Sequence, residues 1–544
     1  MIRFDDVDRS YSSAKTGFRQ EIPDTFNFAF DVIDAWATER DKTAVIAVSA
    51  DGETVTPWQY SDFSDQSGRF GNALLSLGLS KGDFACVVVG RIPEWYSVLF
   101  GCMKAGVVSM PGTNLLTSKD IAYRVNHSKA KAVIVTPEHC GKIDEIRADC
   151  PSLTQFIVIG DAPDGWLSFG DLCQANDPDV NREAIGLTRS DDMMMAYFTS
   201  GTTAMPKMVP RDFGYALAHS ATGLFWMDLS EDDVHWTLTD TGWAKAAWGM
   251  LFPQFLLGAT IVLYNGDKGF DADLHLSLIT KLNVTTFCAP PTVYRLFAQK
   301  DLKAFDLSSL RRCFGAGEPL NPEVIRYWHE NTGTVIADGY GQTETINIVA
   351  NFPGVPVKHG SMGKPVPGYD VDIVDDAGNR LADGEIGHIA VNTQGEWPAG
   401  LFHGYYTGGD LDQSSFRNGW YYTGDTATRD EDGYLWFVGR ADDLISSAGY
   451  RISPFEVESA LLEHDAVAES AVIGVPDETR GQIVMAYIIL AGGFEAGEQL
   501  KADIQEFCKK QTAPYKYPRE IEFVTELPKT ISGKIRRVEL REKA

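Results

Sequence analysis

Short apolar runs alternate with amphipathic stretches from about residue 84 onward, and this alternation constrains the fold more than any other feature. Residues 85–90 (ACVVVG) precede an amphipathic stretch at 93–106, and the apolar runs at 131–137 and 260–264 continue the scheme. Strands that are apolar on both faces belong to parallel sheets whose two sides are covered by helices. This part of the chain is therefore predicted to form α/β structure with parallel-rich sheets.

The pattern changes after residue 365. Residues 371–380 (VDIVDDAGNR) and 430–440 (DEDGYLWFVGR) are typical of short strands joined by Asp/Gly turns, which predicts a small antiparallel subdomain. A chain of 544 residues exceeds one ordinary domain. We expect a large N-terminal domain over 1–441 and a small mobile C-terminal α+β domain over 442–544.

The C-terminal segment has a mixed pattern that supports a compact domain of its own. Apolar periodicity predicts helices near 454–464 and 500–510, and strands at 471–475 and 483–490. The overall fold class is therefore α/β plus α+β.

The net charge of −27 argues against nucleic acid and anionic membranes as partners, since both require a cationic face. Small anions such as ATP or CoA remain compatible with a local basic pocket. The eight cysteines include no C-x2-C pair, which favours buried free thiols in a reducing compartment over a zinc site. The first residues lack the apolar core of a signal peptide, and the stretch at 250–264 is too interrupted to cross a bilayer. These features predict a cytoplasmic protein without membrane insertion, and a homodimer is compatible with them.

The segment from Tyr197 to Lys207 (YFTSGTTAMPK) carries the strongest chemical signal. Backbone N–H groups and hydroxyls in such a loop form a donor-rich site for phosphate oxygens, and Lys207 would add a positive charge. The segment lacks the G-x-x-x-x-G-K-[ST] pattern, so it is not a Walker A loop. From composition alone, a Ser/Thr-rich surface turn is an equal alternative.

The order T-S-G-T-T-x-x-P-K resembles the phosphate loop of the adenylate-forming superfamily, which contains acyl-CoA synthetases, luciferases and peptide-synthetase adenylation domains. The superfamily's further motifs follow in order over nearly all the remaining chain: Gly315–Pro319 (GAGEP), Asp338–Glu344 (DGYGQTE), Tyr422–Asp425 (YTGD), Gly439–Asp443 (GRADD), Ser447–Arg451 (SAGYR) and Pro528–Lys534 (PKTISGK). The resemblance is closest to the medium-chain acyl-CoA synthetases. One departure is Ala204, where many relatives have glycine.

The resemblance implies an ATP-dependent acid:CoA ligase that forms AMP, with Mg²⁺ as cofactor. Its catalytic residues would be Lys534, Thr202, Glu344 and Arg451. Glu344 and Thr202 would hold the metal, directly or through water. The residues that the resemblance assigns to ATP or AMP are Thr199, Ser200, Gly201, Thr202, Thr203, Lys207, Gly317, Glu318, Pro319, Asp338, Gly339, Tyr340, Gly341, Gln342, Thr343, Asp425, Arg440, Arg451 and Lys534.

Several of these assignments have a physical reason. Tyr340 offers a flat face to adenine, and the Asp425 carboxylate can accept hydrogen bonds from both ribose hydroxyls. Attack of a carboxylate on the α-phosphate develops negative charge that a positioned cation such as Lys534 would stabilise. In isolation, an ordinary hairpin residue is the alternative for Asp425, and Lys534 is more typical of a solvated surface lysine.

A catalytic lysine on a separate domain implies motion, and Asp442 matches the superfamily's hinge position. Rotation would replace Lys534 by the SAGYR loop and open a path for CoA. The resemblance suggests CoA contacts at Ala448, Gly449, Tyr450, Arg480 and Lys516, although Arg480 and Lys516 in isolation are typical of surface charges.

The acyl pocket is predicted beside DGYGQTE, lined by Trp243, Gly315 and Gly341. Trp243 lies among several tryptophans, so core packing is the simpler interpretation of that residue. Acetate-specific relatives have tryptophan at the position of Gly341, so glycine there predicts an acid larger than propionate, medium-chain or aromatic.

Two other functions stay open. An adenylating enzyme could pass the acyl group to an acceptor other than CoA. A catalytically silent nucleotide-binding protein is the alternative from another class, although it need not keep Lys534, Glu344, Asp425 and Arg451 together.

Overall fold

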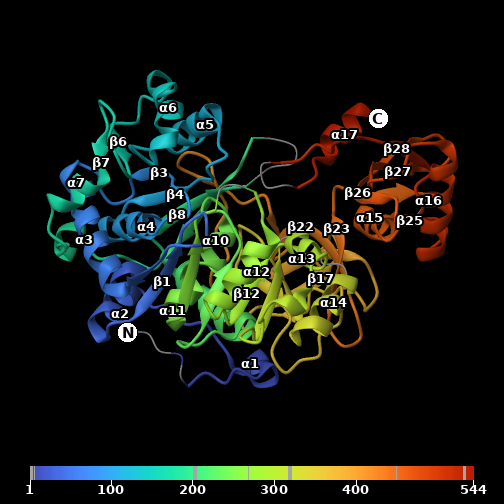
Figure 1. Cartoon of the computed structure of the whole chain (residues 1–544), viewed down its shortest axis with the longest axis horizontal. Coiled ribbons are helices and arrows are strands. Elements are labelled where there is room, and N and C mark those ends of the chain that lie inside the picture. Colours follow the sequence, from blue (N-terminus) through green and yellow to red (C-terminus); the bar gives the residue numbers. More distant parts are fainter. Residues whose placement is uncertain are drawn as a thin grey trace. The chain divides into compact units, whose positions relative to one another are not determined.

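The computed structural model describes residues 4, 6–199, 205–266, 269–316, 322–448, 450–530 and 534–544 (Figure 1). Among these residues, the chain divides into two compact units. The first contains residues up to 199, 208–370 and 393–414, and the second contains 205–207, 371–392 and 415–544. The antiparallel segment that the sequence placed in the large domain thus groups with the C-terminal residues. The predicted boundary at 441/442 concerns which segment moves, and it stays a prediction.

Within the described part of the first unit, the strands form two nine-stranded sheets. The order in one is β16 (Lys364–Pro365), β15 (Asn347–Ala350), β14 (Ile336–Gly341), β13 (Arg312–Ala316), β12 (Thr286–Ala289), β10 (Val234–Thr237), β11 (Thr260–Tyr264), β1 (Thr43–Val48), β2 (Val55–Gln59). The order in the other is β20 (Leu411–Asp412), β19 (Tyr405–Tyr406), β9 (Met208–Asp212), β8 (Met193–Phe198), β4 (Val108–Pro111), β3 (Phe84–Val88), β5 (Ala132–Val135), β6 (Gln155–Val158), β7 (Leu167–Ser168). Their central pairings are parallel, which confirms the predicted parallel-rich architecture.

Helices flank these sheets, as Figure 1 shows for α3 to α7 in blue and cyan and for α12 to α14 in green and yellow. The described α-helices of this unit are α1 (Tyr11–Gly17), α2 (Asp34–Glu39), α3 (Tyr60–Ser76), α4 (Glu94–Ala105), α5 (Ser118–Ser128), α6 (Cys140–Asp144), α7 (Phe169–Gln174), α8 (Arg182–Ile185), α9 (Phe213–Ala221), α10 (Ala244–Gly249), α11 (Phe252–Leu257), α12 (Ala272–Lys281), α13 (Pro291–Phe297) and α14 (Pro322–Thr332). The apolar stretch at 250–264 contains α11 and β11, separated by Gly258 in the left-handed conformation. A π-helical segment, η4 (Thr222–Met227), continues α9.

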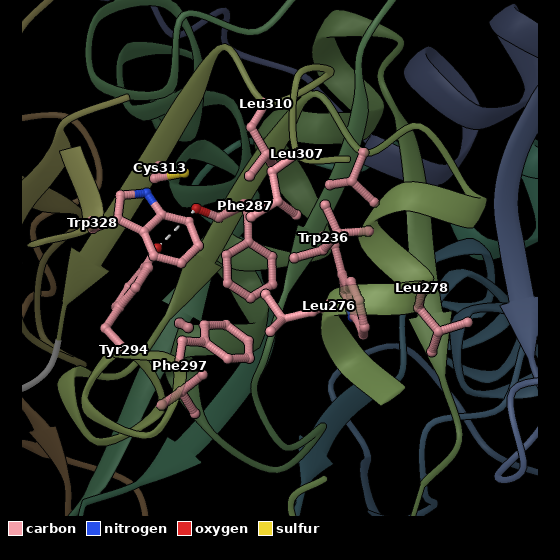
Figure 2. Close-up of a cluster of buried hydrophobic side chains, with 14 of the residues drawn as sticks. Trp236, Leu276, Leu278, Phe287, Tyr294, Phe297, Leu307, Leu310, Cys313 and Trp328 are labelled. Atoms are coloured by element: carbon pink, nitrogen blue, oxygen red, sulfur yellow. Dashed lines mark hydrogen bonds between the residues drawn. The ribbon is translucent and has the colours of Figure 1, made fainter. Parts of the chain in front are cut away.

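One apolar core lies between β10, β12 and β13 and the helices α12, α13 and α14 (Figure 2). Trp236, Phe287 and Trp328 are among its fully buried members. Side chains from strands and helices far apart in sequence pack together here. This core therefore holds β13 and β14 against the helices.

The second unit contains two further sheets among its described residues. The antiparallel sheet consists of β17 (Val371–Val374), β18 (Gly387–Asn392), β22 (Trp420–Arg429), β21 (Phe416–Arg417) and β23 (Leu435–Arg440). The other consists of β25 (Tyr450–Ile452), β24 (Ile445–Ser447), β27 (Gly481–Leu490), β26 (Val467–Asp477) and β28 (Glu520–Phe523). Helices α15 (Pro454–Leu462), α16 (Glu498–Gln511) and α17 (Arg537–Lys543) complete the unit, and α15 and α16 confirm the two predicted helices.

All eight cysteines are buried free thiols, as predicted. Burial raises their pKa values, to about 12 for Cys86. No described helix is both long and apolar enough to cross a membrane.

Candidate functional site

The predicted phosphate loop connects β8 to β9. Phe198 and Met208 pair directly across these antiparallel strands, so the loop starts and ends at neighbouring strand ends. Thr199 is half-buried at its beginning and Lys207 is exposed at its end. Ser200, Gly201, Thr202, Thr203 and the departure at Ala204 lie outside the described residues, so their predicted roles stay predictions.

Strand β14 carries the first part of DGYGQTE beside β13, which carries the first two residues of GAGEP. Gly315 pairs with Asp338, and Ala316 pairs with Gly339, in parallel register. The structure therefore brings Gly315 and Asp338 together as neighbours, while Gly317, Glu318 and Pro319 lie outside the described residues. The N–H of Gly339 donates to Asp338 Oδ1 over 2.9 Å, and burial raises the pKa of Asp338 to about 8. Tyr340 and Gly341 complete the strand, with Tyr340 half-buried.

Trp226, which the sequence did not single out, lies directly behind this strand. Its Nε1–H donates to the carbonyl of Ala337 over 3.2 Å, and its ring lies 2.6 Å from where a Cβ on Gly339 would stand. Gly339 is therefore required for close packing of the strand on an indole ring. Trp226 also packs on Trp248, with ring centroids 5.3 Å apart.

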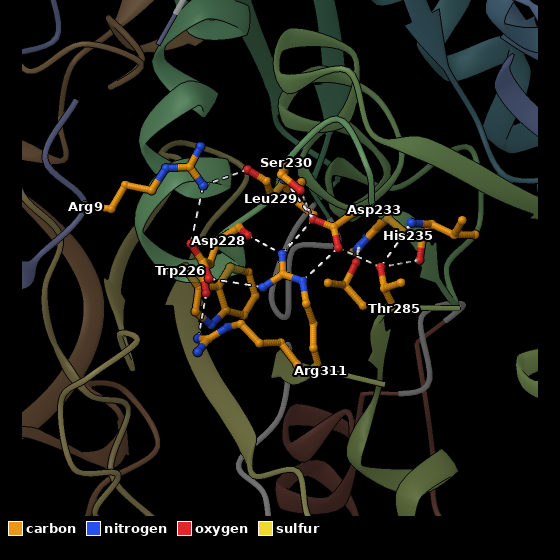
Figure 3. Close-up of polar contacts among 12 residues, drawn as sticks. Arg9, Trp226, Asp228, Leu229, Ser230, Asp233, His235, Thr285 and Arg311 are labelled. Carbon is orange, nitrogen blue, oxygen red and sulfur yellow. Dashed lines mark hydrogen bonds and ion pairs between the residues drawn. The ribbon is translucent and has the colours of Figure 1, made fainter. Parts of the chain in front are cut away.

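An ion-pair network surrounds the end of η4, where Trp226 lies (Figure 3). The Arg311 guanidinium donates to both carboxylate oxygens of Asp233 and contacts Asp228, whose carboxylate also pairs with Arg9. The Arg311 hydrogen bonds hold the pKa of Asp233 below its usual range despite burial. This network connects the N-terminal segment to β10 and β13 and supports the strand register next to Asp338.

Glu344, the predicted metal ligand, is only 8 % exposed in the turn between β14 and β15. Its Oε1 accepts a 2.8 Å hydrogen bond from the hydroxyl of Tyr405, and its backbone carbonyl accepts from Arg211 Nη1 and the N–H of Phe402, both over 2.9 Å. Gln342 and Thr343, in the same turn, are half-buried. Sequence reasoning missed both Tyr405 and Arg211.

Arg211 is 2 % exposed, and its guanidinium lies 3.7 Å from the centroid of the Tyr215 ring. It also donates to the carbonyl of Gly400. The signal that could have revealed it is a lone arginine within the apolar strand that follows the phosphate loop. Its backbone contacts fix the loop that presents Glu344.

A single carboxylate fits Mg²⁺ better than a metal that needs several protein ligands. The described residues contain no group of three or more His, Cys, Asp or Glu side chains arranged to hold a metal. Mg²⁺ keeps several waters and takes one or two carboxylates plus substrate phosphates. Glu344 would hold it in that manner, and Thr202 lies outside the described residues.

In the second unit, Asp425 and Arg440 face each other across β22 and β23. Arg440 Nη1 is 3.4 Å from Asp425 Oδ1, and Arg440 Nε is 3.5 Å from Asp442 Oδ1. The structure thus brings the predicted ribose residue, a predicted nucleotide contact and the predicted hinge residue together around one guanidinium.

The SAGYR motif forms the β24–β25 hairpin. Ala448 adopts a left-handed conformation, with φ at 49°, and its N–H donates to the carbonyl of Arg480 over 2.8 Å. Tyr450 is 51 % exposed and stacks on Tyr515 with centroids 4.1 Å apart, and Arg451 is exposed beside it. Gly449 lies outside the described residues.

Two of the predicted cations have different surroundings. Lys516 Nζ pairs with both carboxylate oxygens of Glu456, at 2.6 and 2.7 Å, so its charge is already compensated. Lys534 is exposed, and its backbone pairs with Thr530.

The predicted acyl-pocket residues receive mixed support. Trp243 is half-buried at the start of α10, whereas Trp236 is a core residue. A Cβ on Gly341 would lie 2.4 Å from the carbonyl oxygen of Ile346 and 2.9 Å from Asn347 Cα. The close approach of this backbone explains why glycine occupies position 341, and the sequence did not reveal it. The role of Gly341 in the acyl pocket stays a prediction.

The chain matches two families of known proteins in the same order as its motifs. AMP-binding enzymes match residues 33–406, and the C-terminal domain of AMP-binding enzymes matches residues 456–534. The chain therefore belongs to the AMP-binding enzymes, the adenylate-forming superfamily.

Similarity to individual members extends over nearly the whole length. The mitochondrial acyl-coenzyme A synthetase ACSM3 of Mus musculus is 43% identical over 98% of this chain and 93% of its own. An acyl-CoA synthetase from Brucella canis is 36% identical with a TM-score of 0.76, over 99% of both chains. The anthranilate CoA ligase AuaEII, solved with anthranoyl-AMP, is 34% identical with a TM-score of 0.86, over 96% of this chain and 98% of its own. Within its family the chain is an AMP-forming acid:CoA ligase of the medium-chain acyl-CoA synthetase branch.

One prediction is wrong in the light of these relatives. The sequence favoured a cytoplasmic protein, but the similar mouse synthetases carry mitochondrial names, which points to the mitochondrion. Net charge, buried thiols and interrupted apolar runs do not distinguish between these two compartments.

Proposed function

We propose that this ligase activates a medium-chain or aromatic acid larger than propionate, using Mg²⁺ and two orientations of its C-terminal segment. The adjacency of Gly315 and Asp338, with buried Glu344 one turn beyond, is the observation that carries the proposal. This arrangement supports a single nucleotide site. There the backbone would approach the adenine base, and the Glu344 carboxylate would lie at the phosphates.

In the first half-reaction the substrate carboxylate attacks the α-phosphate of ATP, forming acyl-AMP and releasing pyrophosphate. Bound Mg²⁺ would neutralise phosphate charge there. Thr199 to Thr203, Lys207 and Thr343 would bind phosphates, Tyr340 would stack on adenine, and Asp425 would accept from the ribose. Lys534 and Arg451 would supply positive charge where it develops.

In the second half-reaction the CoA thiol attacks the acyl carbonyl, forming the thioester and releasing AMP. We propose that residues 442–544 rotate about Asp442 between the steps, so that Lys534 serves only the first. The SAGYR hairpin and Arg480 would then meet CoA. Lys516 contributes only if its ion pair with Glu456 opens.

The size of the acid is supported by the relatives more than by Gly341. AuaEII acts on anthranilate, an aromatic acid, and the mouse relatives are acyl-CoA synthetases. Trp243 and Gly315 remain the proposed pocket residues. Apolar pockets distinguish one methylene by only about 1–3 kcal/mol, so broad selectivity is expected.

A panel of acids tests the proposal. The enzyme is incubated with ATP, Mg²⁺ and acetate, propionate, hexanoate, octanoate, benzoate or anthranilate, with and without CoA, and AMP and pyrophosphate are measured. We expect CoA-dependent turnover that favours the larger acids. A preference for acetate, or turnover that CoA does not change, would refute it.

A further inference from the structure

Lys534 belongs to a short antiparallel stem, in which it pairs with Thr530. The N–H of Thr530 donates to the carbonyl of Lys534 over 2.7 Å, and the N–H of Lys534 donates to Thr530 Oγ1 over 3.1 Å. Lys529 and Ile535 form an antiparallel bridge beside them. The stem runs without interruption into α17, which begins at Arg537, so whatever holds the start of α17 also holds the stem.

All three nitrogen atoms of the Arg537 guanidinium take part in holding the start of α17. Its two Nη2 hydrogen bonds reach both carboxylate oxygens of Glu458 on α15, each over 2.8 Å. Its Nε donates to the carbonyl of Val472 on β26 over 3.2 Å, and its Nη1 lies 3.4 Å from Asp443 Oδ2. One side chain three positions after Lys534 therefore joins a helix, a strand and the segment that follows β23.

The partners of Arg537 are themselves fixed. Glu458 is 7 % exposed, and its Oε1 also accepts a 2.7 Å hydrogen bond from the N–H of Val472. Asp443 receives a second guanidinium, that of Arg541, one turn further along α17. Because paired, buried guanidinium–carboxylate contacts have a specific geometry, they hold backbone direction as well as charge.

We infer that Arg537 is a positioning residue for Lys534 in the adenylation half-reaction, and that Asp443 connects the Lys534 stem to the hinge residue next to it. The inference rests on the proposed role of Lys534. Asp443 is adjacent to Asp442, so a rotation there would carry the stem, α15 and β26 as one body. Without Arg537 the lysine would still be present, but its ammonium group would no longer be held in a defined place.

The test compares Arg537→Gln with Arg536→Gln. Arg536 is the neighbouring arginine, but its side chain is largely exposed and pairs only with Glu539 among the described contacts. Since Arg537→Gln leaves the Glu458 carboxylate buried and without its cation, a second variant, Arg537→Gln with Glu458→Gln, removes both charges and guards against unfolding. Thermal melting identifies any variant that fails to fold.

Each half-reaction is measured separately. Adenylation is followed by ATP–pyrophosphate exchange, and thioester formation is followed from preformed acyl-AMP and CoA. For Arg537→Gln and for the double variant we expect a loss of about 10- to 100-fold in the adenylation kcat, in line with the effect of a displacement of about 1 Å. The KM for ATP, the thioester rate and all rates of Arg536→Gln should change less than about twofold by the same reasoning.

Lys534→Ala separates this inference from the proposed function. If Lys534→Ala keeps adenylation, the proposed role of Lys534 fails, and the inference fails with it. We expect Lys534→Ala to lose only adenylation. If it does so while Arg537→Gln and the double variant keep adenylation, or lose both half-reactions equally, only the positioning role is refuted. Faster hydrogen exchange at 528–536 in Arg537→Gln, but not in Arg536→Gln, would further support the attachment.

Discussion

The hydroxyl of Tyr405 donates a 2.8 Å hydrogen bond to Oε1 of Glu344, across 61 residues of sequence. The bond contacts the carboxylate directly, while Arg211 and the N–H of Phe402 hold the backbone carbonyl of the same residue. Tyr405 thus holds one oxygen of the Glu344 carboxylate and helps to orient the proposed metal ligand.

Tyr405→Phe is expected to raise the Mg²⁺ concentration needed for half-maximal adenylation. Hydrogen bonds to charged groups contribute about 1.5–3 kcal/mol, which corresponds to roughly a tenfold change or more. The measurement is a Mg²⁺ titration of ATP–pyrophosphate exchange. Tyr406→Phe is the matched control, because Tyr406 instead packs against Phe84 and His127. Identical titrations for the two variants would show that the bond does not orient a metal ligand.

Gly339→Ala is expected to destabilise the protein and weaken ATP binding, because its Cβ would overlap the Trp226 ring. Overpacking costs about 1–3 kcal/mol. Trp226→Phe makes room for this Cβ. The loss in free energy of unfolding of the double variant should therefore be smaller than the sum of the two single losses by about 1 kcal/mol. Urea unfolding of all four proteins measures this coupling, and strict additivity would contradict it.

Gly341→Ala distinguishes the two explanations for this glycine. Backbone contact with Ile346 and Asn347 predicts lower stability and equal losses of kcat/KM for acetate and hexanoate. An acyl-pocket role predicts that alanine is tolerated and that Gly341→Trp shifts preference towards acetate. We expect the first result, with a stability loss of about 1–3 kcal/mol for the overpacked site.

Asp338 should make stability depend on pH. Burial raises its pKa to about 8 from 3.8, so the folded protein keeps a proton that the unfolded chain releases. Its contribution to stability is complete below the unfolded value and is lost as pH rises through about 8. Asp338→Asn removes this dependence. Urea unfolding at pH 5, 7 and 9 measures the free energy of unfolding of both proteins. That of the variant should rise relative to that of the wild type as pH rises, and a constant difference would contradict the assignment.

The sequence predicted the elements of this site better than their surroundings. Parallel strands followed from apolar runs, and the motif order indicated which strand ends carry chemistry. The contacts of Trp226, Arg211 and Tyr405 could not be predicted, because each residue acts on a motif more than 60 residues away through a carbonyl, a ring face or a single hydroxyl. Such contacts depend on tertiary packing and leave no local periodicity.

Gly341 and Lys516 have close neighbours that the sequence did not reveal, while their predicted roles stay predictions. The backbone of Ile346 and Asn347 lies close to Gly341, and Glu456 pairs with Lys516. Residue type alone does not reveal what occupies the neighbouring volume.

The burial of all eight cysteines makes the chain suitable for site-specific fluorescent labelling. Maleimides react with exposed thiolates, and here burial both shields the sulfur atoms and raises their pKa values, as for Cys86 and Cys102. Cysteines introduced at exposed Lys119 and Glu495, one in each unit, would be the principal sites to accept dyes. Energy transfer between the two dyes could then follow single enzyme molecules through a turnover without removal of any native thiol.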